Sequence, residues 1–358
     1  MDLSSLLTEF THRDWQTVDD AEPIRFALIG LGWWTRDEAM PAVAESDLCT
    51  TTVGVSSSPE KASAVADEHD TVERGITYEE FHDGVAADRY DAVYICTPNA
   101  THPEYVETAA ELGKDVLCEK PMAATAEGAR RIVEACDDRN VTLMIAYRMQ
   151  TEPAIRRARD LIDAGIVGDP IQVHGHMSDR LPELIPDPDQ WRLDPTLSGG
   201  TTLIDIGLYP LNTTRFLLGR DPVEAYADTA ADHEWFEGLD EHATFQLTFE
   251  GGVSAACTVS HNAHNASHLK VIGSEGEITI EPVFFPWDDR ELTVRHGTST
   301  ATISFDQRNQ MTEEFDYFAH CLITGAEPVA DGRHGLIDIH AIEALYESAE
   351  TGTRVTLD

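Results

Sequence analysis

The sequence predicts an α/β protein of two domains, a doubly wound parallel sheet followed by an α+β domain with a large, mostly antiparallel open sheet. Three observations support this prediction. The 358 residues are enough for two domains. Apolar strands alternate with helical patterns up to Tyr147, and short alternating strands joined by turns follow. We place the first domain at residues 23–148, the second at 149–358 and an N-terminal arm at 1–22.

Five apolar stretches supply the predicted parallel strands: residues 24–30, 50–57, 90–98, 115–119 and 141–147. Between them, apolar residues recur three or four positions apart, as in residues 102–113 and 125–140, which is typical of helices. These strands are apolar on both faces, so both faces of the sheet must be covered by helices. The first domain is therefore predicted to be doubly wound.

The second domain has a different pattern. Helices are predicted at residues 152–164, 199–218, 311–323 and 335–348, and strands at 170–178, 242–260, 268–282 and 291–305. Turns such as EGG and SEGE separate several strands, which indicates hairpins and an antiparallel sheet. The far face of such a sheet needs a cover. We expect a second copy of the chain there, so the prediction is a homo-oligomer, a dimer or tetramer, formed through this sheet.

The charge of the chain is strongly negative. It has 65 Asp and Glu against 25 Lys and Arg, a formal net charge of -40. Molar salt shortens the Debye length to about 3 Å and would screen this self-repulsion. The acidic residues are spread along the chain, which favours a halophilic protein over an acidic partner-binding protein, whose charge is usually gathered in blocks. No basic patch is visible, so nucleic acid is not an expected partner.

The cysteines and the apolar segments bear on location. The six cysteines are scattered without CxxC spacing, as expected of buried reduced thiols in an intracellular protein. No segment approaches the roughly 18 apolar residues of a membrane span, and residues 1–20 are too polar for a secretion signal. We therefore expect a cytoplasmic protein without a membrane partner.

A glycine-rich turn follows the first strand. In GLGWWT, Gly30 and Gly32 stand where a tight turn lets the backbone approach a pyrophosphate at a helix N-terminus, and Thr35 replaces the third glycine of the fingerprint. Such a pair of glycines is weak evidence alone. Its place after the first strand of a run of βαβ units predicts a dinucleotide-binding Rossmann domain rather than an ordinary strand–helix turn.

The end of the second strand indicates which dinucleotide binds. An acidic residue there would grip the ribose hydroxyls of NAD, but the chain has three serines at 56–58 and no carboxylate at the tip. Hydroxyl groups can donate to a 2′-phosphate, and Lys61 can neutralise it. This predicts NADP, although no arginine is present and Glu60 lies close by.

Lysine is rare, and one lysine stands at a strand end. The four lysines are Lys61, Lys114, Lys120 and Lys270. Lys120 follows the fourth apolar strand, and the carboxyl ends of parallel strands form the ligand-binding edge of an open sheet. A solvated surface lysine is the alternative. A chain that has lost most of its lysines favours a functional one here.

A second chemical pattern lies in the long apolar helix. Asp205 and Tyr209 are four residues apart, so they share one helix face and can reach one small ligand. A carboxylate between Ile204 and Ile206 is difficult to explain as structural. For Tyr209 alone, a half-buried aromatic residue on a core helix remains an alternative.

Several segments carry a family resemblance: GLGWWT (30–35), CTPNATHPEY (96–105), CEKPMA (118–123), AYRMQTEPAI (146–155) and WRLDPTLSGGTTLIDIGLYPLN (191–212). In this order they resemble the glucose–fructose oxidoreductase / inositol dehydrogenase (Gfo/Idh/MocA) family of sugar dehydrogenases. The resemblance extends from Ile24 to the end of the chain. It implies a Rossmann domain, NADP as cofactor and hydride transfer from a sugar.

The resemblance also implies roles for individual residues. The lysine of the EKP element, Lys120, would contact the reacting hydroxyl and the nicotinamide ribose, and Asp205 and Tyr209 would face the substrate. A free tyrosine has a pKa of about 10, so a nearby cation must favour the phenolate if Tyr209 is to accept a proton at neutral pH. We expect Tyr209 to be the base or proton relay, Lys120 its electrostatic partner, and Asp205 the group that orients the sugar hydroxyls.

Further site residues are expected from these patterns and from the resemblance. The expected cofactor-binding residues are Gly30, Gly32, Trp33, Trp34, Ser56, Ser57, Ser58, Lys61, Thr97, Pro98, Asn99, His102, Glu119, Lys120, Arg148, Trp191 and Arg192. Arg148 is also a candidate for substrate binding, or else an ordinary ion-pair residue. Histidines 174, 176, 261, 264 and 268 could suggest a metal, but no cysteine or second acid completes a ligand set and hydride transfer needs none, so no metal is expected.

The pattern within the family favours an aldopentose substrate. The tyrosine at position 209 is similar to that of aldose-oxidising members, whereas inositol-type members have histidine. We therefore expect oxidation of an aldopentose, D-xylose in the first place, at C1 to the aldonolactone with reduction of NADP. The alternatives are a glucose-type aldose dehydrogenase, a glucose–fructose oxidoreductase, a dihydrodiol dehydrogenase, or a sugar- or nucleotide-sensing regulator without catalysis.

Overall fold

The computed structural model describes residues 15, 18, 21–305 and 308–357. The chain forms two compact units. We call residues 13–148 and 309–336 the Rossmann unit, and residues 149–308 and 337–358 the sheet unit. The predicted arm, residues 1–22, falls mostly outside the described residues. Within it, Trp15 is buried, and its ring meets that of Tyr317 edge-on at 5.2 Å between centroids.

The Rossmann unit contains a six-stranded parallel sheet. Its strands are β1 (Ile24–Ile29), β2 (Cys49–Ser56), β3 (Arg74–Thr77), β4 (Ala92–Ile95), β5 (Asp115–Glu119) and β6 (Leu143–Ala146). The order is β3-β2-β1-β4-β5-β6, the arrangement of a doubly wound dinucleotide-binding sheet. Every residue of β4 and β6 is buried, as expected when helices cover both faces. The parallel sheet is confirmed, and β3 is a strand that the sequence pattern missed.

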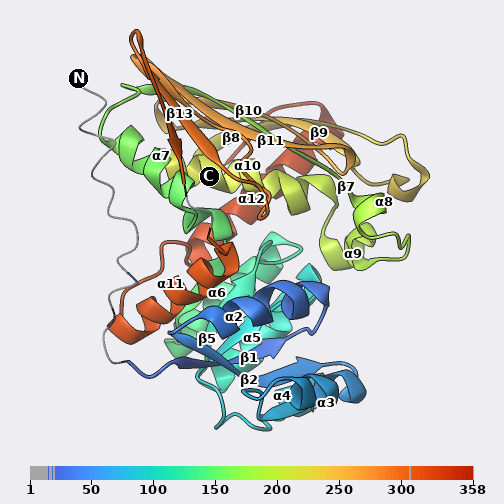
Figure 1. The fold of residues 1–358 in the computed structure, drawn as a ribbon. Helices are drawn as coiled ribbons and strands as arrows, with labels where there is room; N and C mark the ends of the chain where they lie inside the picture. Colours follow the sequence, from blue (N-terminus) through green and yellow to red (C-terminus); the bar gives the residue numbers. More distant parts are fainter. Residues whose placement is uncertain (1–14, 16–17, 19–20, 306–307, 358) are drawn as a thin grey trace. The chain divides into compact units, whose positions relative to one another are not determined.

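Helical segments connect and cover these strands, as Figure 1 shows. They are the π-helix η2 (Thr35–Ala39) with α2 (Met40–Glu45), α3 (Pro59–Glu68), α4 (Tyr78–His82), the 3₁₀ turn η3 (Asn99–Thr101), α5 (His102–Glu111), α6 (Ala126–Arg139) and α11 (Gln310–Thr324). The hydroxyls of Ser58, Thr77 and Thr125 cap α3, α4 and α6 by accepting hydrogen bonds from the first turn. These caps explain why the helices begin where they do.

Helix α11 belongs to the Rossmann unit, whereas the sequence placed it in the second domain. The ring of Phe315 meets that of Phe26 in β1 edge-on, with centroids 5.2 Å apart. The Phe315 carbonyl accepts from the Cys49 thiol at 3.4 Å, and the Thr312 hydroxyl donates to the Ala42 carbonyl at 3.2 Å. Packing against strands distant in sequence decides which unit the helix joins, so no local pattern signals it.

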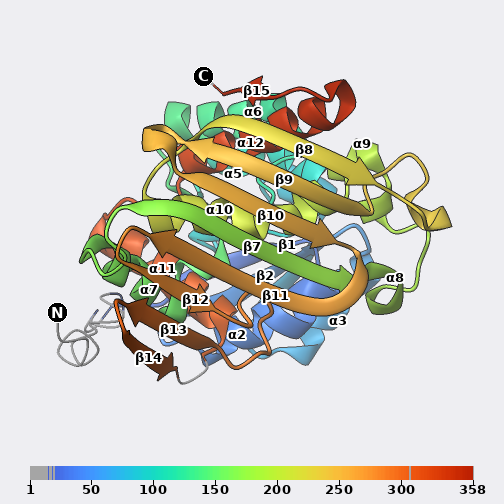
Figure 2. The same cartoon turned by 90° about the horizontal axis from the view of Figure 1, so that it is seen from above.

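The sheet unit contains nine strands, seen face-on in Figure 2. They are β7 (Pro170–Arg180), β8 (Pro222–Ala230), β9 (His242–Phe249), β10 (Ser254–Ser260), β11 (Asn262–Gly273), β12 (Gly276–Ile280), β13 (Glu291–His296), β14 (Ser299–Ser304) and β15 (Val355–Thr356). The order is β14-β13-β12-β11-β7-β10-β9-β8-β15. Only the β7–β10 pair is parallel, so the predicted mostly antiparallel sheet is confirmed.

The sheet unit also contains helical segments, of which the longer ones lie on one face of the sheet (Figure 1). They are α7 (Pro153–Asp163), α8 (Leu181–Leu184), η5 (Trp191–Leu193), α9 (Pro195–Ser198), the π-helix η6 (Leu203–Gly207) with α10 (Leu208–Leu218), η7 (Glu234–Phe236), η8 (Glu250–Gly252) and α12 (Gly332–Thr351), whose first five residues count with the Rossmann unit. Strand β9 alternates between buried Phe245 and Leu247 and exposed Thr244 and Gln246. One face is therefore core, and the other is exposed in the described chain.

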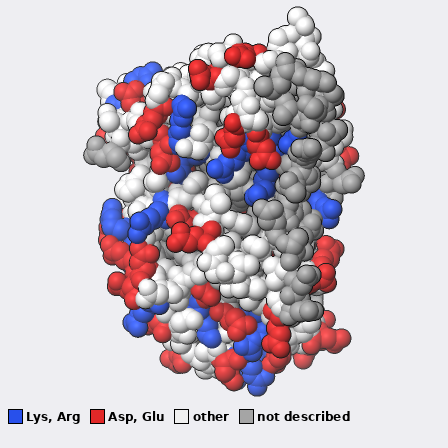
Figure 3. All heavy atoms as spheres, turned by 90° about the vertical axis from the view of Figure 1, so that its left-hand side faces the viewer, with Lys and Arg blue, Asp and Glu red and all other residues white. Residues whose placement is uncertain are grey.

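The distribution of surface charge and the state of the cysteines agree with the expectations from the sequence. On the face shown in Figure 3, Asp and Glu are scattered among Lys and Arg over the described surface. All six cysteines are free thiols. Within the described residues, no helix has the length and apolar character needed to cross a membrane.

Candidate functional site

The glycine-rich turn after β1 is shaped for close approach. Gly30 has a φ of 93°, and a Cβ built on it would lie 2.2 Å from the Cys96 carbonyl oxygen, so no other residue fits. The Thr35 hydroxyl donates to the Gly30 carbonyl at 2.6 Å and closes the turn in place of a third glycine. A Cβ on Gly32 would meet nothing within 4 Å, so the backbone is open there. This cradle suits a pyrophosphate at the start of the helix that follows.

Two indole rings begin that helix. Trp33 and Trp34 contact each other edge-on with centroids 5.4 Å apart, and Trp33 is 40% exposed. Trp33 is therefore accessible beside the turn.

The serines at the end of β2 have different roles. Ser56 is buried, and its hydroxyl accepts from the Ser58 amide at 3.3 Å. The Ser58 hydroxyl accepts from the Lys61 amide at 3.1 Å and donates to Glu60 at 3.0 Å. Ser57 and Lys61 are exposed. Of the four predicted phosphate ligands, these two have accessible side chains, while the other two shape the turn.

The loop after β4 is held by a buried histidine. His102 has no exposed surface, and its ring nitrogens lie 2.9 Å from the Thr97 carbonyl oxygen and 3.2 Å from that of Met122. Burial lowers the pKa of His102, although the two carbonyls oppose this. Thr97 and Asn99 are also buried. His102 thus ties the loop at residues 97–102 to the segment after Lys120, and its effect on a cofactor site would be indirect.

The carboxylate of Glu119 lies directly before Lys120 at the end of β5. The Tyr94 hydroxyl donates to one Glu119 oxygen at 2.6 Å, and the Lys120 amide donates to the other at 3.1 Å. Burial raises the pKa of Glu119, while these hydrogen bonds and the charges of Lys120 and Arg148 oppose the rise. Glu119 therefore fixes the backbone that carries Lys120.

Arg148 is buried close to a second carboxyl group. Its guanidinium donates to the Gln310 amide oxygen, and its charge acts on both Glu119 and Glu314. Glu314 has no exposed surface, and among the described residues neither of its oxygens has a hydrogen-bond partner. Burial and the neighbouring Glu119 raise the pKa of Glu314 well above its ordinary value. Arg148 thus acts as an internal counter-ion, which favours the structural interpretation of this residue.

The contacts of the other lysines test whether the scarcity of lysine in this chain indicates a functional role for those that remain. Lys114 donates to the Tyr90 carbonyl at 2.8 Å, and Lys270 pairs with Glu277 at 2.7 Å. These two lysines have structural partners. Rarity alone therefore does not mark a functional lysine, and the case for Lys120 depends on its place at the carboxyl end of β5.

In the sheet unit, Asp205 and Tyr209 lie on one open face of a helix. Asp205 is in the π-helix η6 and Tyr209 in the first turn of α10. Every residue from Thr201 to Leu217 is buried except these two, which are partly exposed. The Tyr209 ring contacts that of Phe284 with centroids 5.8 Å apart. A π-helical turn is a frequent feature of functional sites, and here it presents the two predicted substrate residues together.

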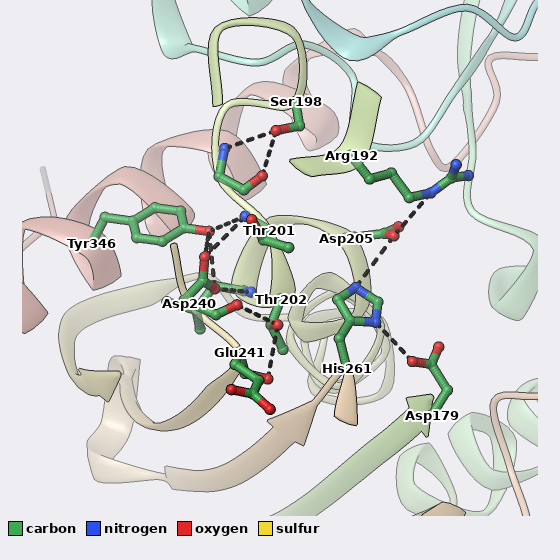
Figure 4. A network of polar contacts seen from close by, with 12 residues as sticks. Asp179, Arg192, Ser198, Thr201, Thr202, Asp205, Asp240, Glu241, His261 and Tyr346 are labelled. Carbon is green, nitrogen blue, oxygen red and sulfur yellow. Dashed lines mark hydrogen bonds and ion pairs between the residues drawn. The ribbon is translucent and has the colours of Figure 1, made fainter. Parts of the chain in front are cut away.

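A buried aspartate fixes the start of this helix (Figure 4). The Asp240 carboxylate accepts from the Thr201 amide at 2.9 Å, from the Leu203 amide at 2.6 Å and from the Tyr346 hydroxyl at 3.1 Å. A Cβ on Gly200, whose φ is 142°, would lie 2.1 Å from the Tyr346 hydroxyl oxygen. The paired glycines before the helix therefore make room for Tyr346, which holds the capping aspartate in place.

The Asp205 carboxylate lies between two basic side chains (Figure 4). Arg192 Nε is 3.4 Å from Asp205 Oδ2, and its guanidinium stacks on Trp191 at 4.6 Å. His261 Nε2 lies 3.5 Å from the same oxygen, and His261 Nδ1 is 2.8 Å from Asp179 Oδ1. Arg192, which is predicted to bind the cofactor, lies beside Asp205, the predicted substrate ligand.

His261 belongs to this polar cluster, which the sequence analysis did not predict. It was considered only as a metal ligand. Its partners lie 82 residues away in Asp179 and 56 residues away in Asp205, and the sequence has no local signal for that pairing. Burial lowers the pKa of His261, but the charge and hydrogen bond of Asp179 and the charge of Asp205 outweigh burial and raise it to about 9.

His176, on the same sheet, has ordinary polar partners. The His176 ring stacks on that of His268 with centroids 5.6 Å apart, and its nitrogens lie 2.7 Å from the Thr258 hydroxyl and 3.0 Å from the Ser178 hydroxyl. In the part of the chain that the structure describes, no group of three or more His, Cys, Asp or Glu side chains is arranged to hold a metal.

Two family models match the chain, one over each unit. Residues 24–147 match the oxidoreductase family with an NAD-binding Rossmann fold, and residues 155–279 match the GFO/IDH/MocA C-terminal domain. The chain belongs to the Gfo/Idh/MocA family. The fold and the family that the sequence motifs indicated are thereby confirmed.

Individual relatives of this Gfo/Idh/MocA protein span its full length. D-xylose 1-dehydrogenase [NADP(+)] of Haloarcula marismortui is 59% identical over 100% of both chains. D-xylose 1-dehydrogenase (NADP(+)) 2 of Haloferax volcanii is 32% identical over 93% of this chain and 99% of that one. The crystal structure of aldose-aldose oxidoreductase from Caulobacter crescentus, complexed with glycerol, matches with a TM-score of 0.88 at 32% identity, covering 94% of this chain and 100% of that one.

Proposed function

We propose that this oxidoreductase oxidises D-xylose at C1 to the aldonolactone and reduces NADP. The observation that carries the proposal is the similarity over the whole chain, at 59% identity, to a D-xylose 1-dehydrogenase that uses NADP. A second xylose dehydrogenase from another haloarchaeon is also similar over nearly the full length. The paired polar side chains on the open face of η6 and α10 supply suitable substrate ligands.

The Rossmann unit fits NADP. Its fit rests on the Gly30 cradle, the open backbone at Gly32, and the exposed Ser57 and Lys61 at the end of β2. When bound, the nicotinamide accepts a hydride from the sugar C1. The side chains at the end of β2 would bind the 2′-phosphate, with Lys61 supplying positive charge and Ser57 a hydroxyl donor. The missing carboxylate at the tip of β2 favours NADP over NAD.

The roles of the residues that act on the sugar follow from the chemical properties of their side chains. Tyr209 accepts the C1 hydroxyl proton, directly or as a relay, because it is one of two side chains on an otherwise buried helix that remain accessible. Lys120 supplies the positive charge that favours the phenolate form of Tyr209. Asp205 accepts hydrogen bonds from the sugar hydroxyls and orients the ring. Glu119 and His102 position the segment that carries Lys120.

The proposal also includes the oligomeric state of the protein and its location in the cell. One face of the nine-stranded sheet is exposed in the described chain, with Gln172, His174 and Gln246 on it, and Ile171 near the start of β7 is 50% exposed. A second copy of the chain would cover this face and form a dimer or tetramer. The net charge of -40 and the free thiols suit a halophilic cytoplasm, where salt screens the surface and thiols stay reduced.

A second candidate is an oxidoreductase that keeps its nucleotide and passes the hydride to another aldose. The structural match to an aldose-aldose oxidoreductase, with a TM-score of 0.88, favours it. The two candidates differ in one measurable product, because only a dehydrogenase accumulates free NADPH.

The experiment is an absorbance assay of NADPH formation in molar KCl. Purified protein is mixed with NADP and a panel of D-xylose, L-arabinose, D-ribose and D-glucose. The proposal expects continuous NADPH formation, fastest with D-xylose and at least about tenfold slower with NAD, since one phosphate contact contributes on the order of 1.4 kcal/mol. Aldonate formation without NADPH would favour the second candidate. Absence of any sugar oxidation would overturn both.

A further inference from the structure

The sheet unit contains a buried histidine between two carboxylates, only one of which has an assigned role. His261 is 1% exposed and stands between β10 and β11. Its backbone is fixed on both sides, since its amide donates to the Glu241 carbonyl at 3.0 Å and its carbonyl accepts from the Leu181 amide at 2.9 Å. These two hydrogen bonds fix the backbone position from which the ring extends.

The two ring nitrogens meet different partners. Nδ1 hydrogen-bonds Asp179 Oδ1 at 2.8 Å, which fixes the ring orientation. Nε2 points at Asp205 Oδ2 from 3.5 Å, which is an ion-pair distance but longer than a hydrogen bond. Among the described residues, Nε2 has no hydrogen-bond partner. A buried N–H aimed at a carboxylate without reaching it is costly unless the ring carries charge or the gap closes.

We propose that His261 is a positioning residue that acts as an imidazolium, holding Asp205 ionised and oriented so that its carboxylate accepts the hydroxyl protons of the sugar. The inference rests on the proposed function, in which Asp205 binds the sugar. Asp179 has the supporting role, because its negative charge stabilises the imidazolium from the side away from Asp205.

The charges around His261 are consistent with this role. Asp179 on β7 and Asp205 on η6 face the ring, and Arg192 on η5 faces Asp205 from 3.4 Å. Glu241, whose backbone pairs with His261, directs its carboxylate elsewhere, to the amides of Asp232 and His233 and the side chain of Asn262. Two anions and two cations balance when the histidine is protonated. With a neutral histidine, the buried end of the cluster would hold one negative charge in excess.

The charge also predicts a pH limit. The pKa of His261 is raised to about 9, so the imidazolium is present at neutral pH and is lost as the pH passes through that value. Loss of the proton would remove one of the two cations that hold Asp205. Sugar binding should then weaken on the alkaline side more than NADP binding does, because the sugar is the proposed ligand of Asp205.

The test separates charge, hydrogen bonding and simple packing with three variants and a control. His261→Asn keeps a donor toward Asp179 but has none that reaches Asp205. His261→Gln places a neutral donor near the Nε2 position. Asp179→Asn keeps an acceptor for Nδ1 but removes the charge. The control is His264→Gln, which alters an exposed histidine on the adjoining strand β11.

The kinetic readout is the KM for D-xylose, with the KM for NADP measured beside it. We expect His261→Asn to raise the sugar KM about ten- to hundredfold, the loss expected for a hydrogen bond to a charged group, with the NADP KM changed less than about twofold. His261→Gln should recover about half of the loss on a logarithmic scale, and the control should match the wild type. A fall in kcat with an unchanged sugar KM would overturn the proposal.

The charge is read directly by an NMR titration of histidine ring signals, with His261 assigned by comparison with His261→Asn. The wild type should titrate near pH 9, and Asp179→Asn should shift the midpoint down by at least about one unit. A wild-type midpoint at or below about 6.5, the ordinary histidine value, would overturn the proposal. The titration needs no sugar, so it remains decisive if D-xylose is not the substrate. In that case the proposed function fails, while the titration still shows whether His261 is protonated.

Discussion

Each unit of the molecule holds two carboxyl groups near each other, and the charges of the two pairs are balanced in different ways. In the Rossmann unit, burial raises the pKa of both Glu119 and Glu314, and Arg148 is the counter-charge that acts on both. In the sheet unit, Asp179 and Asp205 flank His261, whose pKa is raised to about 9. In the Rossmann unit, protonation of a carboxyl group removes one negative charge from the pair. In the sheet unit, the cationic ring of His261 lies between the two carboxylates and allows both to stay ionised.

The difference shows which pair can serve a reaction. A protonated carboxyl such as Glu314, with no exposed surface, can contribute to packing but cannot attract a substrate. Asp205 keeps 21% of its side chain exposed, and its counter-charges lie behind and beside it. The sheet unit therefore presents a partly exposed anion, whereas the Rossmann unit buries the Glu314 carboxyl completely.

The largest expected effect concerns activity. Asp205→Asn removes the exposed anion while keeping the shape of the side chain, and kcat/KM for D-xylose should fall about 10²- to 10³-fold, as for the loss of one preorganised polar group. Glu314→Gln replaces a protonated carboxyl by a neutral amide and should change kcat/KM less than about threefold. The NADPH assay measures both. Similar losses of kcat/KM in the two variants would contradict the proposed difference between the exposed Asp205 and the buried Glu314.

The next effect is on stability in the Rossmann unit. Arg148→Met should lower the free energy of unfolding by about 3 kcal/mol, because buried carboxyls lose their counter-charge. Glu314→Gln should remain within about 1 kcal/mol of the wild type. Arg295→Met, which removes an exposed pair with Glu277, is the matched control and should cost no more than about 1 kcal/mol. Urea denaturation in constant salt gives the values, and equal losses for the two arginines would contradict a buried counter-ion.

The pH dependence of stability should distinguish the two clusters. A raised pKa contributes stability that is present below the unfolded value and is lost as the pH rises through the folded value. For His261 this window runs from about 6.5 to about 9, and for Glu314 it starts near 4.5. The difference in unfolding free energy between wild type and His261→Asn should therefore shrink between these limits. A difference that is constant from pH 6 to 9.5 would show that His261 is neutral.

The smallest effect separates accessible from structural lysines. Lys61→Ala should raise the KM for NADP about five- to tenfold and leave the KM for NAD unchanged, because one exposed charge on the 2′-phosphate is lost. Lys270→Ala, which removes the ion pair with Glu277, should leave both values unchanged. Steady-state kinetics with each cofactor measures this. Equal changes for NADP and NAD would place Lys61 away from the phosphate.

The local sequence pattern predicted those elements that are determined by the residues within the segment itself. Strand β1 and the turn at Gly30 were predicted because an apolar run followed by glycines has few other outcomes. The face shared by Asp205 and Tyr209 was predicted from helical spacing, although the turn that holds Asp205 is a π-helix. Strand β3 was missed because Arg74–Thr77 is four residues long with one buried position, which is too short for an alternating pattern.

Contacts between distant residues could not be predicted. The pairing of His261 with Asp179 and Asp205 arises because β7, β11 and η6 meet in the folded unit. The place of α11 depends on Phe315 packing against Phe26, and the partner of Arg192 depends on how η5 folds back toward η6. Such contacts are long-range in sequence, and an amphipathic pattern gives the face of an element but not its neighbour.

The central proposal for this site is that Lys120 acts in the chemical step, in addition to any contact with the nicotinamide ribose. Its most direct test is Lys120→Met, with NADP affinity followed by quenching of tryptophan fluorescence and turnover followed by NADPH formation from D-xylose in molar KCl. We predict that the NADP dissociation constant changes less than about threefold while kcat falls at least about 10²-fold. Turnover close to that of the wild type, with normal NADP binding, would contradict the account.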